Sequence, residues 1–179
     1  MPVTVQPCAS EARENATFEA LLWALSRPGH PRMLPEPGLD AIIDALLDRE
    51  CRVHASDPLL VPRIMRTGAE IADIDVADHV FLGATPKPEV LSRLAVGSDL
   101  YPDGGATVFV TVTLGEGAAL RLTGPGVNGA CDLRVAGLAD GFWQARAARS
   151  RYPMGFDLFI QDGARIIGVP RSTCVEVLK

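Results

Sequence analysis

Apolar residues near the start of the chain recur with the period of an amphipathic helix. Between residues 18 and 25 they follow the i, i+3, i+4, i+7 spacing that places side chains on one helix face. Ser10 stands where a helix N-cap is expected, and Pro28 cannot continue the helical pattern. We therefore expect a helix over residues 11–25, preceded by a flexible arm at residues 1–10.

Similar patterns predict the remaining secondary structure. Helical segments are expected at residues 39–49, 62–67, 88–95 and 138–148. Strands are expected at residues 52–60, 76–82, 107–114, 120–123, 157–160 and 165–169. Glycine-containing turns predict that the last four of these strands form two hairpins. Because helices alternate with strands early and hairpins dominate late, we expect a three-layer α/β/α fold with a mixed sheet, in one domain over residues 1–179.

The composition narrows the classes of protein that need to be considered. Hydrophobic residues make up 47% of the chain, which is enough for a large core and also for a subunit interface. The net charge of −5 gives no basic footprint for nucleic acid, and no apolar run approaches the ~20 residues that span a bilayer. No signal peptide is recognisable, and the four cysteines lack a metal-chelating spacing. We expect a cytoplasmic protein with reduced thiols.

Arginines supply the residues that could bind an anion or a partner. Arg146 and Arg149 are three residues apart on a predicted helix, and their guanidinium groups could hold phosphate or carboxylate in bidentate fashion. A solvated helix face is the competing interpretation. Arg121 is a further possible anion contact.

A second group of polar residues follows the last predicted strand. Arg171 could bring the charge to an anion site, with Ser172 and Thr173 as hydroxyl donors. Alternatively, Pro170 only ends the strand and the hydroxyls cap the segment that follows.

The remaining motifs give no catalytic signature. The glycine-rich turn at residues 124–126 matches neither the P-loop nor the dinucleotide fingerprint, so a tight turn is the simpler interpretation. The three histidines have no metal-ligand spacing, and no Ser or Cys lies in a nucleophile elbow. We therefore identify no catalytic residue, metal site or cofactor site.

Four segments carry a resemblance to a known family. They read FEALLWALSRPG at residues 18–29, LRLTGPG at 120–126, YPMGFD at 152–157 and VPRSTCVE at 169–176. Each motif is weak alone, but their order and separations resemble the PhnH family, the H subunit of the bacterial carbon–phosphorus lyase system. The resemblance covers residues 10–178, and the middle of the chain, residues 34–100, adds little to it.

The resemblance implies more than the composition does. It implies a fold similar to the large domain of pyridoxal-phosphate-dependent transferases, without the cofactor. It also implies an accessory subunit that forms a homodimer in isolation and joins the G, I and J subunits in a cytoplasmic complex. That complex would make α-D-ribose 1-methylphosphonate 5-triphosphate from ATP and methylphosphonate.

Two alternatives to this subunit role stay open. One is a stand-alone binder of a phosphonate or nucleotide anion, with Arg121 or Arg171 as contacts. The other is a pyridoxal-phosphate transferase, for which the chain offers only Lys87 and Lys179 as Schiff-base lysines. Lys87 lies in a proline-bracketed turn and Lys179 is the last residue, whereas a Schiff-base amine needs desolvation.

Overall fold

A computed structural model describes residues 7–178 of the chain. The helices are α1 (Ala9–Ser26), α2 (Asp40–Leu46), α3 (Val61–Thr67) and α4 (Phe142–Arg149), with 3₁₀ turns η1 (Pro58–Leu60), η2 (Pro88–Arg93) and η3 (Pro102–Gly104). The strands are β1 (Arg32–Met33), β2 (Arg52–Ala55), β3 (Glu70–Ile71), β4 (His79–Ala84), β5 (Thr107–Thr111), β6 (Thr113–Thr123), β7 (Cys131–Ala136), β8 (Asp157–Asp162), β9 (Arg165–Val169) and β10 (Cys174–Val177).

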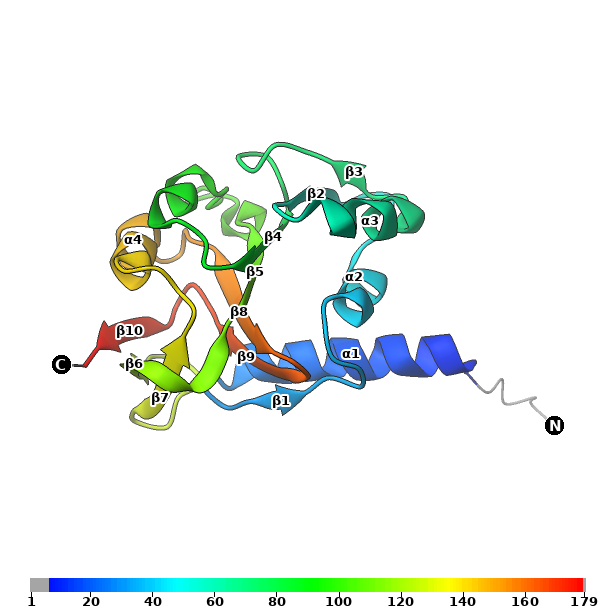
Figure 1. Cartoon of the computed structure of the whole chain (residues 1–179). Helices are drawn as coiled ribbons and strands as arrows, with labels where there is room; N and C mark the ends of the chain where they lie inside the picture. The colour runs from blue at the N-terminus through cyan, green and yellow to red at the C-terminus, as the bar shows by residue number, and fades with distance from the viewer. Residues whose placement is uncertain (1–6, 179) are drawn as a thin grey trace.

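A mixed seven-stranded sheet organises the molecule, in the order β1-β9-β8-β5-β4-β2-β3 (Figure 1). Neighbouring strands from β8 through β5, β4 and β2 to β3 run parallel, while β9 and β1 add antiparallel pairs at the other edge. The predicted mixed α/β class is thus confirmed. The resemblance to pyridoxal-phosphate transferases stays a prediction.

Successive residues of the central strands supply two separate apolar cores. On one face, Phe81, Phe109 and Phe159 stack across β4, β5 and β8 with ring centroids 4.9 and 5.1 Å apart. This face packs against buried residues of α1, α2 and α3. On the other face, Val108 and Val110 pack in a cluster that includes residues of η2, α4 and β6. The three consecutive apolar residues at 108–110 are all buried because both faces of β5 are covered.

Helix α1 lies directly on the backbone of β9. A Cβ at Gly168 would come within 2.6 Å of the carbonyl group of Ala24, so only glycine permits this approach. The helix begins at Ala9, inside the segment expected to be an arm, because the Glu11 carboxylate accepts a hydrogen bond from the Cys8 amide at 2.7 Å. The first six residues of that expected arm lie outside the described part of the chain.

One predicted hairpin is confirmed and the other is wrong. Strands β8 and β9 pair in antiparallel fashion across the turn at residues 163–164. By contrast, β5 is enclosed by β4 and β8, so the chain cannot fold back onto it. Residues 113–123 instead form one long strand, β6, in a separate three-stranded sheet with the order β10-β6-β7. Strands β1, β3, β7 and β10 were not predicted.

Other predicted boundaries shift by a few residues. The helix expected at 39–49 ends at Leu46, and the one expected at 138–148 begins at Phe142. The segment at 88–95 forms the 3₁₀ turn η2, with Pro88 at its first position. Between Pro7 and Leu178 no helix is long and apolar enough to cross a bilayer.

Candidate functional site

The side chain of Arg146 points from α4 to the loop that joins β9 to β10. Its Nη1 donates to the carbonyl oxygen of Thr173 at 3.0 Å, and its Nη2 donates to those of Pro170 at 2.7 Å and Val169 at 3.2 Å. Only 3% of Arg146 is exposed. The guanidinium group therefore fixes this loop against α4.

Arg146 is a buried cation without an acidic partner in the described part of the chain. Burial lowers the pKa of Arg146 to about 10, and the nearby charge of Asp157 partly opposes this shift. The side chain is still protonated at neutral pH. The centroid of the Phe156 ring lies 5.9 Å from the guanidinium carbon, so a cation–π interaction also stabilises the charge.

Arg171, by contrast, has its own counter-charge. Its Nη2 donates to Asp157 Oδ2 at 2.6 Å, and its backbone amide donates to Asp157 Oδ1 at 2.8 Å. The same side chain also donates to the carbonyl oxygen of Pro102. Because the pair is largely buried, Asp157 neutralises Arg171 and leaves Arg146 without an ion-pair partner of its own.

These residues surround a hollow of about 240 Å³ between α4 and the β9–β10 loop, which we call the Arg146–Arg171 pocket. It is lined by Trp143, Arg146, Ala147, Ser150, Tyr152, Arg171, Ser172, Thr173, Cys174 and Val175. Three buried polar atoms of this lining have no hydrogen-bond partner: Arg146 Nε, Ser150 Oγ and Thr173 Oγ1. Buried polar groups are normally paired, so this concentration marks the pocket as a candidate site.

The fold brings together four of the six residues singled out in the sequence. Arg146, Arg171, Ser172 and Thr173 line the same pocket. Arg121 lies elsewhere, on β6, where its guanidinium group pairs with Asp132 at 2.8 Å on the surface.

Arg149 does not share the position of Arg146, although the two are three residues apart on α4. Its Nη2 donates to the carbonyl oxygen of Leu94, at the end of η2, at 2.5 Å. The expected cluster of helix arginines is therefore divided between two sides of the helix.

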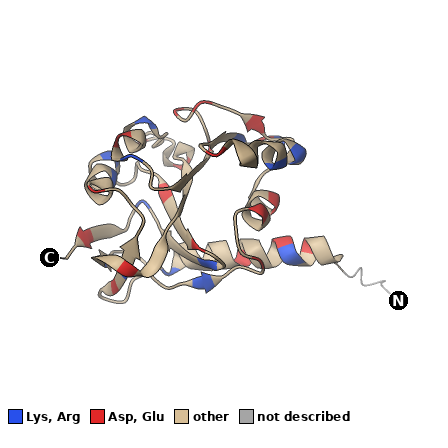
Figure 2. Ribbon diagram, viewed as in Figure 1, with Lys and Arg blue, Asp and Glu red and all other residues tan. Residues whose placement is uncertain are grey.

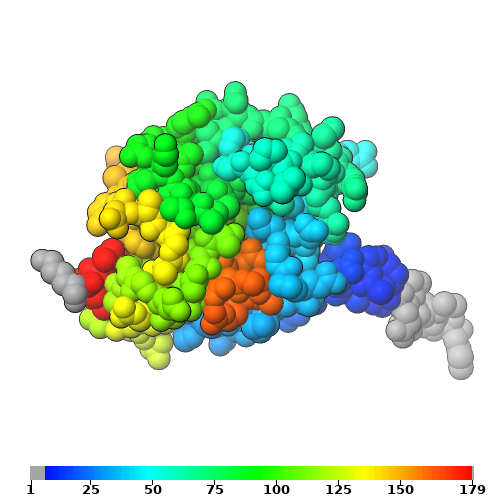
Figure 3. Space-filling view, viewed as in Figure 1, coloured from blue at the N-terminus to red at the C-terminus, as the bar shows by residue number. Residues whose placement is uncertain are grey.

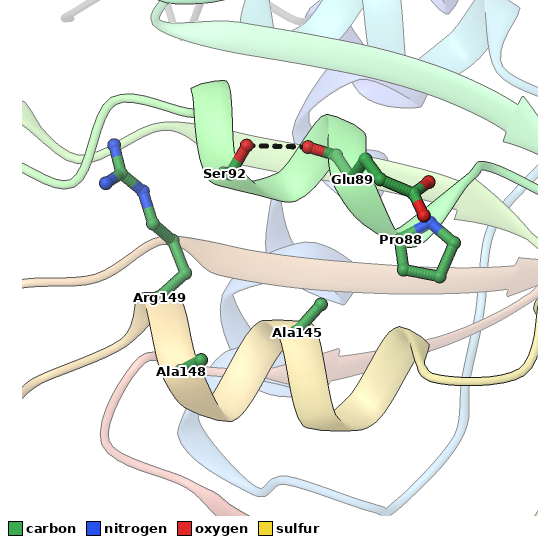
Figure 4. A pocket seen from close by; sticks show the side chains of 6 residues that line it. All are labelled: Pro88, Glu89, Ser92, Ala145, Ala148 and Arg149. Atoms are coloured by element: carbon green, nitrogen blue, oxygen red, sulfur yellow. Dashed lines mark hydrogen bonds between the residues drawn. The ribbon is translucent and has the colours of Figure 1, made fainter.

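A larger hollow, of about 490 Å³, lies between η2 and α4 (Figure 4). Arg149 stands at one end and Pro88 and Glu89 at the other, with two alanines of α4 along the wall. Because it holds one carboxylate and one engaged arginine, its charges balance. We give the smaller pocket more weight, since its charge is unbalanced and its buried donors are unpaired.

Two residues that shape the Arg146–Arg171 pocket were missed from sequence: Ser150, which lines it, and Asp157, which pairs with Arg171. Ser150 had no signal, since a serine at a helix end is common. Asp157 gave no signal for this role, because its partner Arg171 is 14 residues away in the chain.

The pocket is rich in donors and poor in catalytic groups. Its lining has two guanidinium groups and several hydroxyls, but no carboxylate, histidine or lysine. Lys87 is exposed near η2, and residues 7–178 contain no group of His, Cys, Asp and Glu able to hold a metal ion. In chemical terms the pocket can bind negative charge, and of the side chains that commonly act as a general base its lining holds only Tyr152 and Cys174.

Three of the four segments with the family resemblance meet near this pocket, and the fourth packs against one of them. The ion pair of Asp157 with Arg171 joins residues 152–157 to residues 169–176. The latter also pair, through β10, with β6. A Cβ at Gly126, just after β6, would lie 2.5 Å from the carbonyl oxygen of Ser26, so this glycine lets the fourth segment approach.

Comparison with known proteins agrees with this resemblance. The family model for "Bacterial phosphonate metabolism protein (PhnH)" matches residues 9–176. A protein of Stutzerimonas stutzeri described as "Putative C-P lyase subunit protein HtxG" is 33% identical over 175 residues, which cover 92% of this chain and 87% of that protein. The chain therefore belongs to the PhnH family of bacterial phosphonate metabolism proteins.

Proposed function

We propose that this chain is an accessory, structural subunit of the carbon–phosphorus lyase core complex in phosphonate catabolism. The observation that carries the proposal is the family match over residues 9–176, together with a relative described as a C-P lyase subunit. Within that complex the chain contributes to formation of α-D-ribose 1-methylphosphonate 5-triphosphate from ATP and methylphosphonate. An accessory role agrees with the lining of the Arg146–Arg171 pocket, which contains no carboxylate, histidine or lysine.

The surface of α1 supports a role in an assembly. Its N-terminal turns extend beyond the body of the molecule (Figure 3). Phe18 and Leu22 on this helix are 52% and 59% exposed, and exposed apolar patches are usually covered by a partner. In the view of Figure 2, basic and acidic residues are interspersed, so apolar contact is the stronger basis for association.

The proposed partners are a second copy of the chain in isolation and the G, I and J subunits in the cytoplasmic complex. Native mass spectrometry of the chain, alone and co-expressed with its G, I and J counterparts, tests this. We expect a homodimer alone and a defined hetero-oligomer after co-expression. A chain that stays apart from those subunits, or a complex that assembles fully without it, contradicts the proposal.

A charge placed on α1 tests the contribution of its apolar face to the hetero-oligomer. We expect Leu22→Glu to reduce incorporation into the complex, because burial of an unpaired carboxylate in an interface is costly. Leu59→Glu is the matched control, since Leu59 is 84% exposed and lies on η1. Equal incorporation of both variants would show that α1 is not part of the contact surface. The native mass spectra would still test whether the chain is a subunit of the complex.

A further inference from the structure

Charge balance at the Arg146–Arg171 pocket is incomplete. Two arginines and one aspartate meet there, and the aspartate is held by Arg171 on both of its oxygens. Arg146 is bonded only to neutral carbonyl groups. The three groups together carry a net charge of about +1, next to a hollow that a ligand can enter.

The hydrogen-bond donors without a partner are concentrated at the same pocket. Six buried side-chain nitrogen or oxygen atoms between residues 7 and 178 have no partner, and three of them belong to the lining of this one pocket. Arg146 has five N–H groups, of which the three carbonyl bonds use three. The Ser150 and Thr173 hydroxyls are buried, and rotation about one side-chain torsion redirects each of them.

Size and chemistry limit the ligand. A hollow of about 240 Å³ is smaller than the roughly 300–1,000 Å³ typical of sites for drug-sized molecules, so it suits a small charged group rather than a whole nucleotide. Guanidinium groups and hydroxyl donors together match the oxygens of a tetrahedral anion. A carboxylate would pair with fewer of these donors.

We propose that the Arg146–Arg171 pocket binds the phosphonate or phosphate group of a small ligand. Arg146 supplies the uncompensated charge, and the hydroxyls of Ser150 and Thr173 donate to the anion oxygens. This inference rests on the proposed function and deepens it, because the subunit would then bind a phosphonate or phosphate group itself. The group has two possible sources, a phosphonate or the phosphate chain of a nucleotide.

Calorimetric titration of the isolated chain tests the proposal, with methylphosphonate, inorganic phosphate and ATP as separate probes. We expect saturable binding of at least one probe, and the tightest probe identifies the source of the group. The same probe should raise the thermal midpoint of unfolding as its concentration rises. Absence of binding for all three probes overturns the proposal.

Thr173→Val separates a binding role from a structural one. The variant keeps the side-chain shape and removes a hydroxyl without a partner, so the folded chain should be as stable as before or slightly more stable. If the hydroxyl donates to the anion, the affinity falls about tenfold. Ser150→Ala should have a similar effect. Unchanged affinity in both variants contradicts the proposal.

Two controls match these variants. Thr17→Val removes a buried hydroxyl that is bonded to the carbonyl oxygen of Arg13, on α1 and away from the pocket. Arg121→Gln removes one positive charge from the surface. Neither should change the affinity, and a loss with either control equal to that of Thr173→Val would refute a specific pocket.

The outcomes also distinguish this inference from the proposed function. If the chain enters the hetero-oligomer but binds none of the anions, the pocket inference fails and the subunit role stands. If it binds an anion through Thr173 but stays apart from the other subunits, the subunit role fails and the pocket stands.

Discussion

The two faces of the seven-stranded sheet use their buried residues differently. The α1–α3 face is closed by apolar side chains, with the stacked rings of Phe81, Phe109 and Phe159 across its centre. The α4 face is also apolar at its centre, but its margin encloses Arg146 and two unpaired hydroxyls. The first arrangement stabilises the fold through the burial of apolar surface. The second retains polar groups whose burial is costly, which is typical of a site with a binding role.

Truncation of the ring stack should have the largest effect on stability. Phe109→Ala removes the central ring, which is fully buried between the other two, and we expect a loss of about 3–5 kcal/mol in the free energy of unfolding. Urea unfolding followed by circular dichroism measures the change. Leu59→Ala is the control, since this exposed side chain should contribute less than about 0.5 kcal/mol. A similar loss in both variants would contradict the structural role of the stack.

Arg146→Leu should have the next largest effect, because it leaves three carbonyl oxygens without their donor. We expect a loss of about 2–4 kcal/mol, since each unsatisfied buried group costs about 1–3 kcal/mol and the shorter side chain admits some water. Urea unfolding is again the measurement. If the variant were more stable than the original chain, the cost of desolvating the charge would outweigh its hydrogen bonds. The α4 face would then gain stability from apolar side chains alone, as the α1–α3 face does.

Asp157→Asn should have a smaller effect at the same margin. The amide oxygen can still accept from the Arg171 backbone amide, so the variant removes charge and keeps one hydrogen bond. We expect a loss of about 1–2 kcal/mol, which is less than for a fully buried pair because both side chains retain some exposure. A double-mutant cycle with Arg171→Met isolates the coupling, and a coupling near zero would contradict a stabilising ion pair.

The same contrast explains which parts of the fold the sequence could predict. The β8–β9 hairpin follows from a local turn between two apolar runs, and it was predicted correctly. The pairing of β6 depends on the occupation of both edges of β5 by distant strands, and no local pattern contains that information. Strand β10 was missed because it is only four residues long and pairs with β6 alone.

The candidate site was predictable to a similar extent. Residue types alone singled out Arg146 and Thr173, which are 27 residues apart and meet across the loop that follows β9. The same reasoning placed Arg149 beside Arg146, because helix periodicity brings i and i+3 together without fixing the direction of long side chains. The counter-charge of Arg171 could be identified only from the fold.

The α1–α3 face also contains a polar side chain that titrates, His79, and it gives the smallest expected effect. Its Nδ1 is buried without a partner, and the ring lines a small hollow with Phe18 and Leu22 of α1. Burial lowers the pKa of His79 below its ordinary value, and the negative charges of Asp78 and Asp48 oppose this only partly. The unfolded chain therefore takes up a proton at about pH 6.5, before the folded chain does.

It follows that the contribution of His79 to stability is complete above about pH 6.5 and is lost as the pH falls through the lower pKa of the folded state. His79→Gln does not titrate, so the stability of the original chain relative to this variant should decrease between pH 8 and pH 5.5. Urea unfolding at several pH values measures the difference. His30→Gln, at an exposed position, should retain the pH dependence of the original chain. If His79→Gln retained it too, the acid sensitivity of the chain would originate from another group.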